Sequence, residues 1–237
     1  MKTLDKCYNF NDADKVKAQG IYPYFRPIQG GEGPVVKMEG KEVVMAGSNT
    51  YLGLTTHPKV IEASIKAIEK YGTSCSGSRF LTGTIDLHIE MEQKIAKFMG
   101  KESALLFSTG FQAGQGSIFP LMGRNDTIFS DKENHASIVA SNMLATSVGI
   151  NVVRYKHNDM ADLERRLSKL DNDAPKLIAT DGVFSTFGDI ANVDQLVAVA
   201  KKYNANVVVD DAHAFGVIGE GGRGTGHHFG VEDSVDL

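Results

Sequence analysis

The sequence predicts an α/β domain with a mostly parallel β-sheet that helices cover on both faces. From residue 103 onward, short apolar segments alternate with segments of helical periodicity. Several of the apolar segments are continuously apolar, which is typical of strands buried on both faces. The helical segments between them are long enough to be crossover connections, so we expect neighbouring strands to run parallel.

Residues 1–50 are expected to form an N-terminal arm and connector. A polar, helical arm is predicted for 1–20, and the proline- and glycine-rich segment 21–41 predicts an irregular connector. A short strand is predicted at 42–46. The remaining residues, 51–237, are expected to form the large domain.

Two helices are predicted before the alternating part of the chain. The first begins at Pro58 and ends at Gly72, with isoleucines at helical spacing between them. The second covers 86–99, with one apolar face and Gly100 as its terminator. The later strands are predicted at 103–107, 126–130, 151–155, 176–180 and 206–210. The later helices are predicted at 111–122, 135–147, 159–170 and 192–203.

The composition argues against several classes of protein. The net charge is −4 with acids and bases interspersed, so we expect neither a nucleic-acid-binding face nor a polybasic membrane patch. Cys7 and Cys75 match no zinc or disulfide pattern, so we expect a cytoplasmic protein without a metal site. The first residues, MKTLDKCYNFNDADK, contain no apolar stretch, so we expect no signal peptide. No segment is apolar for the roughly 18 residues of a membrane helix.

Candidate site residues follow the predicted strands, because ligands of such sheets bind beyond the carboxyl ends of the strands. In STGFQAG (108–114), Gly110 opens a helix whose backbone amides suit a phosphate, although an ordinary turn has the same pattern. In DKENHAS (131–137), His135 either stacks on a planar ligand or is structural. In DGVFSTFGD (181–189), Asp181 and Ser185 either hydrogen-bond a ligand or cap the turn.

The glycine-rich segment GEGGRG (219–224) formally matches a dinucleotide-binding fingerprint. In that fingerprint the glycines directly follow the first strand, and an acid comes about 20 residues later. Here they follow a long loop late in the chain, so a mobile or tightly turning loop is favoured over NAD binding.

The segment DDAHAFG (210–216) fits neither a zinc site nor a Ser-His-Asp triad, because further ligands and a G-x-S-x-G elbow are missing. A carboxylate that keeps a pyridine nitrogen protonated fits better, and pyridoxal 5′-phosphate (PLP) needs such an anion. Asp210 would then meet the ring nitrogen and His213 the ring oxygen. The phosphate would lie at STGF, His135 would stack on the ring, and Ser185 would assist.

With these motifs the chain resembles the α-oxoamine synthases, PLP-dependent acyltransferases of fold-type I. The resemblance runs from about residue 20 to the end through SNTYLGL, GSRFLTGT, STGF, NHAS, DGVFS and VDDAHAFGVIGEGGRG. It implies a three-layer large domain like that of aspartate aminotransferase, with a smaller C-terminal domain that this chain lacks. It also implies a homodimer.

The resemblance assigns roles residue by residue. Asp210, His213 and His135 would be catalytic. The cofactor-binding residues would be Gly110, Phe111, His135, Ser185, Asp210 and His213. The substrate-binding residues would be Asn49, Ser78 and Arg79, the last two in the loop that reaches the subunit interface.

Members of the family condense an amino acid with an acyl-CoA. GSRFLTGTIDLHIEME and STGFQ look most like bacterial serine palmitoyltransferase, which joins L-serine to palmitoyl-CoA with loss of CoA and CO2 in the first step of sphingolipid synthesis. Tyr22, Tyr24 and Phe25, beside the single Arg26, either suit an apolar acyl chain or simply pack the arm. 8-Amino-7-oxononanoate synthase and glycine C-acetyltransferase are the alternatives.

The chain departs from the family in one respect. No lysine occurs after Lys202, whereas the family's cofactor-binding lysine follows the DDAH strand. We therefore expect a fragment whose lysine lies beyond Leu237, or a break in numbering near a modified lysine, and no turnover by the chain alone. A non-catalytic partner subunit is the non-enzyme alternative.

Overall fold

The computed structural model describes residues 2–237, apart from the side chain of Glu32. The chain forms two compact units, Met1–Ala67 and Ile68–Leu237. The division differs in position from the predicted arm and large domain, whose boundary was placed between residues 50 and 51.

The first unit carries a small antiparallel sheet. Its strands are β1 (Ile28–Glu32), β2 (Val35–Met38) and β3 (Lys41–Val44), and the helices before them are α1 (Asp5–Tyr8) and α2 (Asp12–Ala18). The segment predicted to be an irregular connector therefore contains two strands. The reason is the β-branched pairs Val35↔Val44 and Val36↔Val43, which favour a ladder between β2 and β3.

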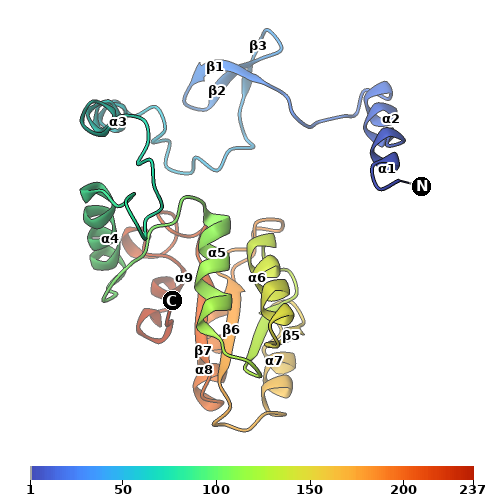
Figure 1. The fold of residues 1–237 in the computed structure, drawn as a ribbon, viewed down its shortest axis with the longest axis vertical. Helices are drawn as coiled ribbons and strands as arrows, with labels where there is room; N and C mark the ends of the chain where they lie inside the picture. The colour runs from blue at the N-terminus through green and yellow to red at the C-terminus, as the bar shows by residue number, and fades with distance from the viewer. Residues whose placement is uncertain (1) are drawn as a thin grey trace. The chain divides into compact units, whose positions relative to one another are not determined.

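The second unit is built on a parallel sheet with the strand order β5-β4-β6-β7 (Figure 1). The strands are β4 (Thr127–Asp131), β5 (Asn151–Tyr155), β6 (Lys176–Asp181) and β7 (Asn206–Asp210). All four were predicted to within one residue. β4 and β6 are buried along their whole length, although their sequences, TIFSD and KLIATD, are apolar only in the middle.

Helices precede, connect and follow these strands along the chain. They are α3 (Pro58–Tyr71, which begins in the first unit), α4 (Asp86–Met99), α5 (Gly110–Ile118), α6 (Ala136–Ser147), α7 (Met160–Leu167), α8 (Val193–Lys202) and α9 (Thr225–His228). Short 3₁₀ turns are η1 (Phe119–Leu121), η2 (Glu220–Gly222) and η3 (Glu232–Ser234). The predicted helices from α3 to α8 are confirmed, although several end earlier than predicted.

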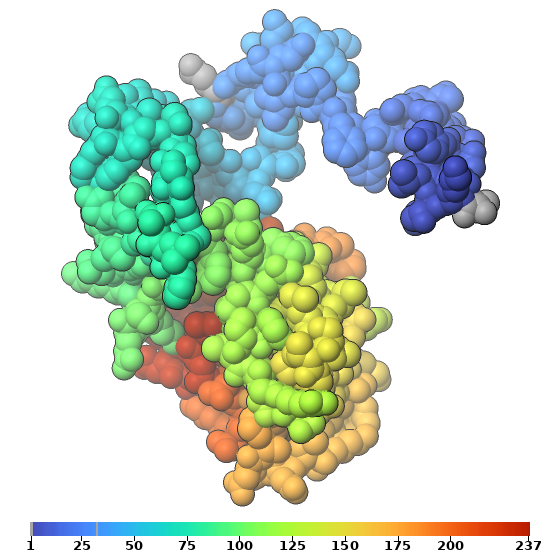
Figure 2. Space-filling model, in the orientation of Figure 1, coloured from blue at the N-terminus to red at the C-terminus, as the bar shows by residue number. Residues whose placement is uncertain are grey.

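The sheet separates two hydrophobic cores, which makes the unit three-layered. Successive residues of a strand point to opposite faces, so Ile128 joins the core under α5 and α6, and Phe129 joins the core under α7 and α8. Leu177 and Ile178 of β6 divide in the same way. Figure 2 shows the side chains of α5 (green) and α6 (yellow) covering one face of the sheet.

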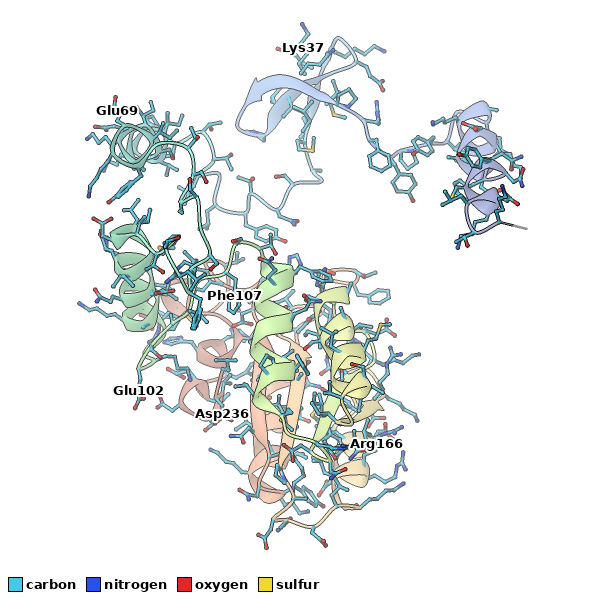
Figure 3. The ribbon with its side chains drawn as sticks, viewed as in Figure 1. Lys37, Glu69, Glu102, Phe107, Arg166 and Asp236 are labelled. Atoms are coloured by element: carbon cyan, nitrogen blue, oxygen red, sulfur yellow. The ribbon has the colours of Figure 1, made fainter. Side chains whose placement is uncertain are left out.

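The segment 103–107 does not form the predicted strand. A strand requires a neighbouring backbone to pair with, and among residues 2–237 none pairs with this segment. The N–H of Leu106 instead donates to Glu92 of α4. Phe107, labelled in Figure 3, lies against α5, where a Cβ on Gly116 would come within 2.6 Å of its ring.

The last residues of the chain run beside β7. Val209 N–H donates to the carbonyl of Leu237, and Leu237 N–H donates to the carbonyl of Val207. The carboxylate of Asp236 accepts the N–H of Val207 at 2.7 Å (Figure 3). The backbone edge of β7 is therefore partly paired by residues 236–237.

Candidate functional site at the carboxyl end of the parallel sheet

Polar side chains end neighbouring strands at one edge of the sheet. Asp181 of β6 is in register with Asp210 of β7, and Asp131 of β4 is in register with Tyr155 of β5. Parallel pairing therefore brings three carboxyl groups to one edge. This is the edge at which ligands of open α/β sheets bind.

The two consecutive acids after β7 have different surroundings. Asp211 accepts the hydroxyl of Thr225 at 2.6 Å on Oδ1 and the N–H of Thr225 at 2.9 Å on Oδ2. Both of its oxygens are thus used to hold the loop after β7. Asp210 accepts the N–H of Ala212 at 3.1 Å on Oδ1. Of the two, Asp210 has the greater remaining capacity to bind a ligand.

The glycine-rich segment 219–224 packs tightly against this end of β7. A Cβ on Gly224 would lie 2.1 Å from Asp211 Oδ2, and a Cβ on Gly222 would overlap the backbone of Gly216. Both glycines have a positive φ, which L side chains rarely adopt. The prediction of a tightly turning loop is confirmed, and the glycines serve close backbone packing.

Asp181 is a buried carboxyl group with an unused oxygen. Its side chain is 3% exposed, and Oδ2 accepts the N–H of His135 at 3.1 Å. Within the described residues, Oδ1 has no hydrogen-bond partner. Burial, followed by the nearby charge of Asp210, raises the pKa of Asp181 to about 7. This edge of the sheet therefore holds an acid that titrates near neutral pH.

His135 is the N-cap of α6. Its Nδ1 accepts the N–H of Ser137 at 3.2 Å, which places the proton of a neutral ring on Nε2. The preceding residue, Asn134, joins the segment after β4 to the end of β6. Its amide nitrogen donates to the carbonyl of Ala179, and its side-chain oxygen accepts the N–H of Asp181. The exposed imidazole of His135 is thereby tied to the end of β6.

Gly110 and Phe111 begin α5, as predicted. Thr109 is the N-cap, and its hydroxyl accepts the N–H of Gln112 at 3.2 Å. A Cβ on Gly110 would meet no atom within 4 Å, so the space beside the first turn of the helix is open at this residue. The partial positive charge of a helix N-terminus faces that space, which suits an anionic group.

Ser185 and His213 lie in the turns that follow β6 and β7. Ser185 is exposed in a turn whose backbone is fixed by the bond from Gly188 N–H to the carbonyl of Phe184 at 2.8 Å. His213 is half-buried in the turn closed by Ala214 N–H and the carbonyl of Asp211. Both residues are carried by strand-end loops, as predicted.

The predicted substrate-binding residues lie elsewhere in the chain. Asn49 belongs to the first unit, with Oδ1 3.5 Å from the hydroxyl of Tyr51. Ser78 and Arg79 belong to the second unit. The guanidinium of Arg79 makes a two-pronged ion pair with Glu92 of α4, at 2.9 and 3.1 Å, which anchors the GSRFLTGT loop. Substrate contact by these three residues stays a prediction.

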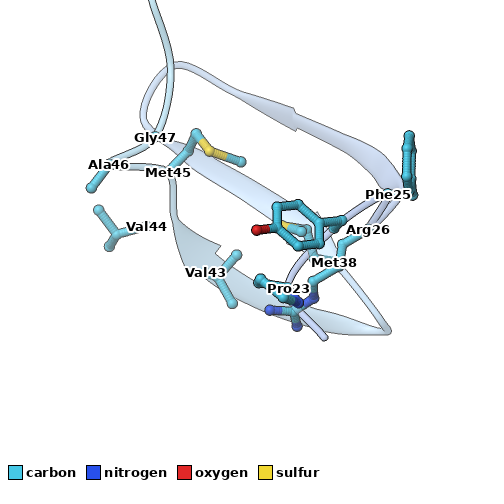
Figure 4. Close-up of a pocket in the computed structure, with 10 residues that line it drawn as sticks. Pro23, Phe25, Arg26, Met38, Val43, Val44, Met45, Ala46 and Gly47 are labelled. Carbon is cyan, nitrogen blue, oxygen red and sulfur yellow. The ribbon is translucent and has the colours of Figure 1, made fainter. Parts of the chain in front are cut away.

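A surface hollow in the first unit contains part of the aromatic segment singled out for an acyl chain (Figure 4). Tyr24 and Phe25 line it together with apolar side chains of β2 and β3, such as Met38 and Val43. Arg26 also lines it and pairs with Glu39 at 2.9 Å. The aromatic residues therefore lie beside other apolar side chains.

Sequence reasoning missed a cluster centred on His157, which follows β5. The ring contacts Asp131 at the end of β4 and Asp189 in the loop after β6. The signal was present, since a histidine two residues beyond a predicted strand also lies at the carboxyl edge.

No group of histidine, cysteine and acidic residues suited to a metal ion occurs within residues 2–237. In the same described part of the chain, no helix is both long and apolar enough to cross a membrane.

Comparison with known sequences places these features in a family. The family model for aminotransferase class I and II matches residues 41–237. A serine palmitoyltransferase of Sphingobacterium spiritivorum is 51% identical over 100% of this chain and 58% of its own length. An 8-amino-7-oxononanoate synthase of Geobacter sulfurreducens is 45% identical over 95% of this chain and 57% of its own length. The chain thus spans less than two thirds of these relatives.

Solved structures agree with this placement. The serine palmitoyltransferase of S. paucimobilis with bound PLP-myriocin aldimine has a TM-score of 0.93 at 36% identity, over 100% of this chain and 59% of that one. The Sphingomonas wittichii serine palmitoyltransferase has a TM-score of 0.90 at 36% identity and the same coverage. The resemblance and the fold predicted from the motifs are confirmed, and the chain belongs to the aminotransferase class I and II family.

Proposed function

We propose that the complete gene product is a PLP-dependent acyltransferase that condenses L-serine with a long-chain acyl-CoA such as palmitoyl-CoA. A carbon–carbon bond forms between the amino-acid α-carbon and the acyl carbonyl carbon. The thioester bond breaks, and the α-carboxyl group leaves as CO2, so the products are a 3-oxo amine, CoA and CO2. The observation that carries the proposal is the meeting of Asp210, Asp181 and the N-terminus of His135's helix at one sheet edge.

The residues at this edge fit PLP. Gly110 opens onto empty space at a helix N-terminus, where a phosphate can approach the backbone amides of Gly110 and Phe111. Both oxygens of Asp211 bind Thr225 in the loop after β7. This leaves the neighbouring Asp210 with capacity for a protonated ring nitrogen. At the same edge, Oδ1 of Asp181 has no hydrogen-bond partner among the described residues, so it can bind a polar ligand group.

Each side chain then has a defined role. Asp210 holds the proton on the pyridine nitrogen, His135 covers one face of the ring, and His213 and Ser185 bind the ring oxygen. When bound, PLP withdraws electrons from the amino-acid α-carbon and so stabilises negative charge there. Asn49, Ser78 and Arg79 are proposed to contact substrate in a homodimer, in which the GSRFLTGT loop reaches the subunit interface.

The choice of substrates follows the relatives. Serine palmitoyltransferases from three genera of bacteria match at 47–52% identity. The 45% identical 8-amino-7-oxononanoate synthase supports a second candidate, in which another amino acid and a dicarboxylic acyl-CoA react.

The test is an assay of amino acids against acyl-CoAs with the complete gene product, in which thiol release is measured. Turnover with L-serine and palmitoyl-CoA supports the proposal. Preference for L-alanine with pimeloyl-CoA would establish the second candidate, and a colourless protein without thiol release after PLP addition would refute both. Asp210→Asn should lose the visible band and the activity. Asp173→Asn, in the exposed turn before β6, is the matched control and should keep both.

A further inference from the structure

A charged cluster outside the proposed cofactor contacts joins three strand-end segments. His157 Nδ1 lies 2.9 Å from Oδ1 of Asp131, the last residue of β4. His157 Nε2 lies 2.7 Å from Oδ2 of Asp189, in the loop after β6. The imidazole thus bridges residues that are 58 positions apart in sequence, since the cluster spans Asp131 to Asp189.

The bridge requires a cationic ring. Ionised carboxylates only accept hydrogen bonds, so both ring nitrogens of His157 must donate. Burial alone would lower the pKa of His157, but the hydrogen bonds to Asp131 and Asp189 outweigh it and raise the pKa above its ordinary value. The two carboxylates are therefore held together by a positive charge between them.

The loop held by this bridge is the one that carries Ser185. Within residues 182–190, Phe184 N–H donates to the carbonyl of Asp189 at 3.0 Å, which closes the turn around Ser185. The Phe184 ring is buried and meets the His157 ring edge to face, with centroids 4.4 Å apart. Asn158 adds a second attachment, because its amide donates to the carbonyl of Ile190 at 3.1 Å.

We propose that His157 is a positioning residue that, by bridging Asp131 and Asp189, fixes the 182–190 turn and so presents Ser185 at the edge where Asp210 and His213 lie. The role of Ser185 at the cofactor rests on the proposed function, whereas the fixing of the turn does not.

If His157 only filled space, His157→Phe should leave the 182–190 turn unchanged, because phenylalanine would retain a ring against Phe184. The proposal leads to a different expectation. The carboxylates of Asp131 and Asp189 would then face each other without a cation, and one buried oxygen of Asp189 already has no partner within the described residues. Because Asp131 belongs to a buried strand of the sheet, their repulsion would displace the loop that carries Asp189.

Hydrogen exchange of the cofactor-free complete gene product tests the fixing of the turn. In His157→Phe, amides in 182–190 should exchange about tenfold faster or more, because charge-assisted hydrogen bonds are lost. Amides in β6 should keep their wild-type rates. His157→Gln, whose hydrogen-bond donors all lie on one nitrogen and so cannot bridge two opposite carboxylates, should lie between the two proteins.

Two further variants keep the result interpretable. Lys176→Met removes the buried ammonium at the opposite end of β6, where it binds the carbonyls of Asn172 and Ala174, and should loosen the fold without singling out 182–190. Asp189→Ala removes the anchor from the loop side and should reproduce the effect if His157→Phe fails to fold. Uniform loosening in His157→Phe, or unchanged exchange in 182–190, would overturn the proposal.

The link to Ser185 has its own readout. The pH midpoint of the bound cofactor's visible absorption band should shift in Ser185→Ala and, in the same direction, in His157→Phe. The double variant should shift no further than Ser185→Ala, because both substitutions remove one contact. Additive shifts would overturn the link to Ser185. A protein that binds no PLP would refute the proposed function, while the exchange experiment would still decide the fixing of the turn.

Discussion

The Asp181→Asn substitution tests the electrostatics of the candidate site without requiring any ligand. Asn has nearly the same shape and keeps an oxygen that can accept the N–H of His135. It removes the carboxylate charge beside Asp210. The second amide atom takes the position of Oδ1, which has no hydrogen-bond partner in the described residues, so no hydrogen bond is lost there. The substitution therefore changes charge with little change in packing.

The expected magnitude follows from the pKa of Asp181. It is about 7 in the folded chain, against an ordinary value of 3.8. Between these values the folded chain holds a proton that the unfolded chain has lost, so the free energy of unfolding falls as the pH rises through this window. At about 1.4 kcal/mol per pH unit, the loss between pH 5 and pH 7 is about 2–3 kcal/mol, and Asp181→Asn removes it.

Urea unfolding of the cofactor-free complete gene product from pH 5 to pH 8 measures this difference. Circular dichroism is the suitable signal, since it reports the loss of helices and strands directly. The stability of Asp181→Asn relative to wild type should grow between pH 5 and pH 7 and level off above pH 7. Asp173→Asn, which changes an exposed acid, should show no such trend. A relative stability of Asp181→Asn that does not change with pH would refute the assigned pKa.

Three glycine substitutions test the space around the backbone in the fold. Gly114→Ala should lower the free energy of unfolding by about 1–3 kcal/mol, because its Cβ would lie 2.9 Å from Ser137. Gly110→Ala, with open space around its Cβ, should leave stability within about 1 kcal/mol but weaken PLP binding, as a fluorescence titration would show. Gly224→Ala should cost more than about 2 kcal/mol, because its Cβ would overlap Asp211 at a positive φ, and a thermal shift near zero would contradict the packing described for this loop.

The sequence predicted the parallel sheet well because each strand carries its own evidence. Segments such as 176–180 have an apolar centre and are followed by an acid, and burial on both faces leaves that pattern in any context. The segment 103–107 has the same pattern but no partner backbone among the described residues. Periodicity reports burial and not pairing, so this prediction was wrong. β1 and β2 were missed because the surrounding prolines and glycines masked the short valine pairs between β2 and β3.

The candidate site was predictable in its composition and not in its connections. Strand-end positions identified Asp210, His135 and Ser185 as candidates. The sequence offered no physical means to choose between Asp210 and Asp211, because the difference lies in Thr225, fourteen positions after Asp211. The contacts of His157 could not be predicted from the sequence either, because they join loops that only the folded sheet brings together.

The proximity of Asp181 and Asp210 leads to a last prediction about ligand binding. Near pH 7 about half of the Asp181 side chains hold a proton, partly because Asp210 is negative. A cationic ring nitrogen bound to Asp210 would offset that charge, lower the pKa of Asp181 and release this proton. Asp181→Asn has no proton to release, so it should take up about half a proton more than wild type when PLP binds at pH 7. Calorimetry in buffers of different ionisation enthalpy measures this number. Equal uptake by the two proteins would mean that the ring nitrogen and Asp181 do not interact, and Asp210 would then not be the partner of a protonated pyridine.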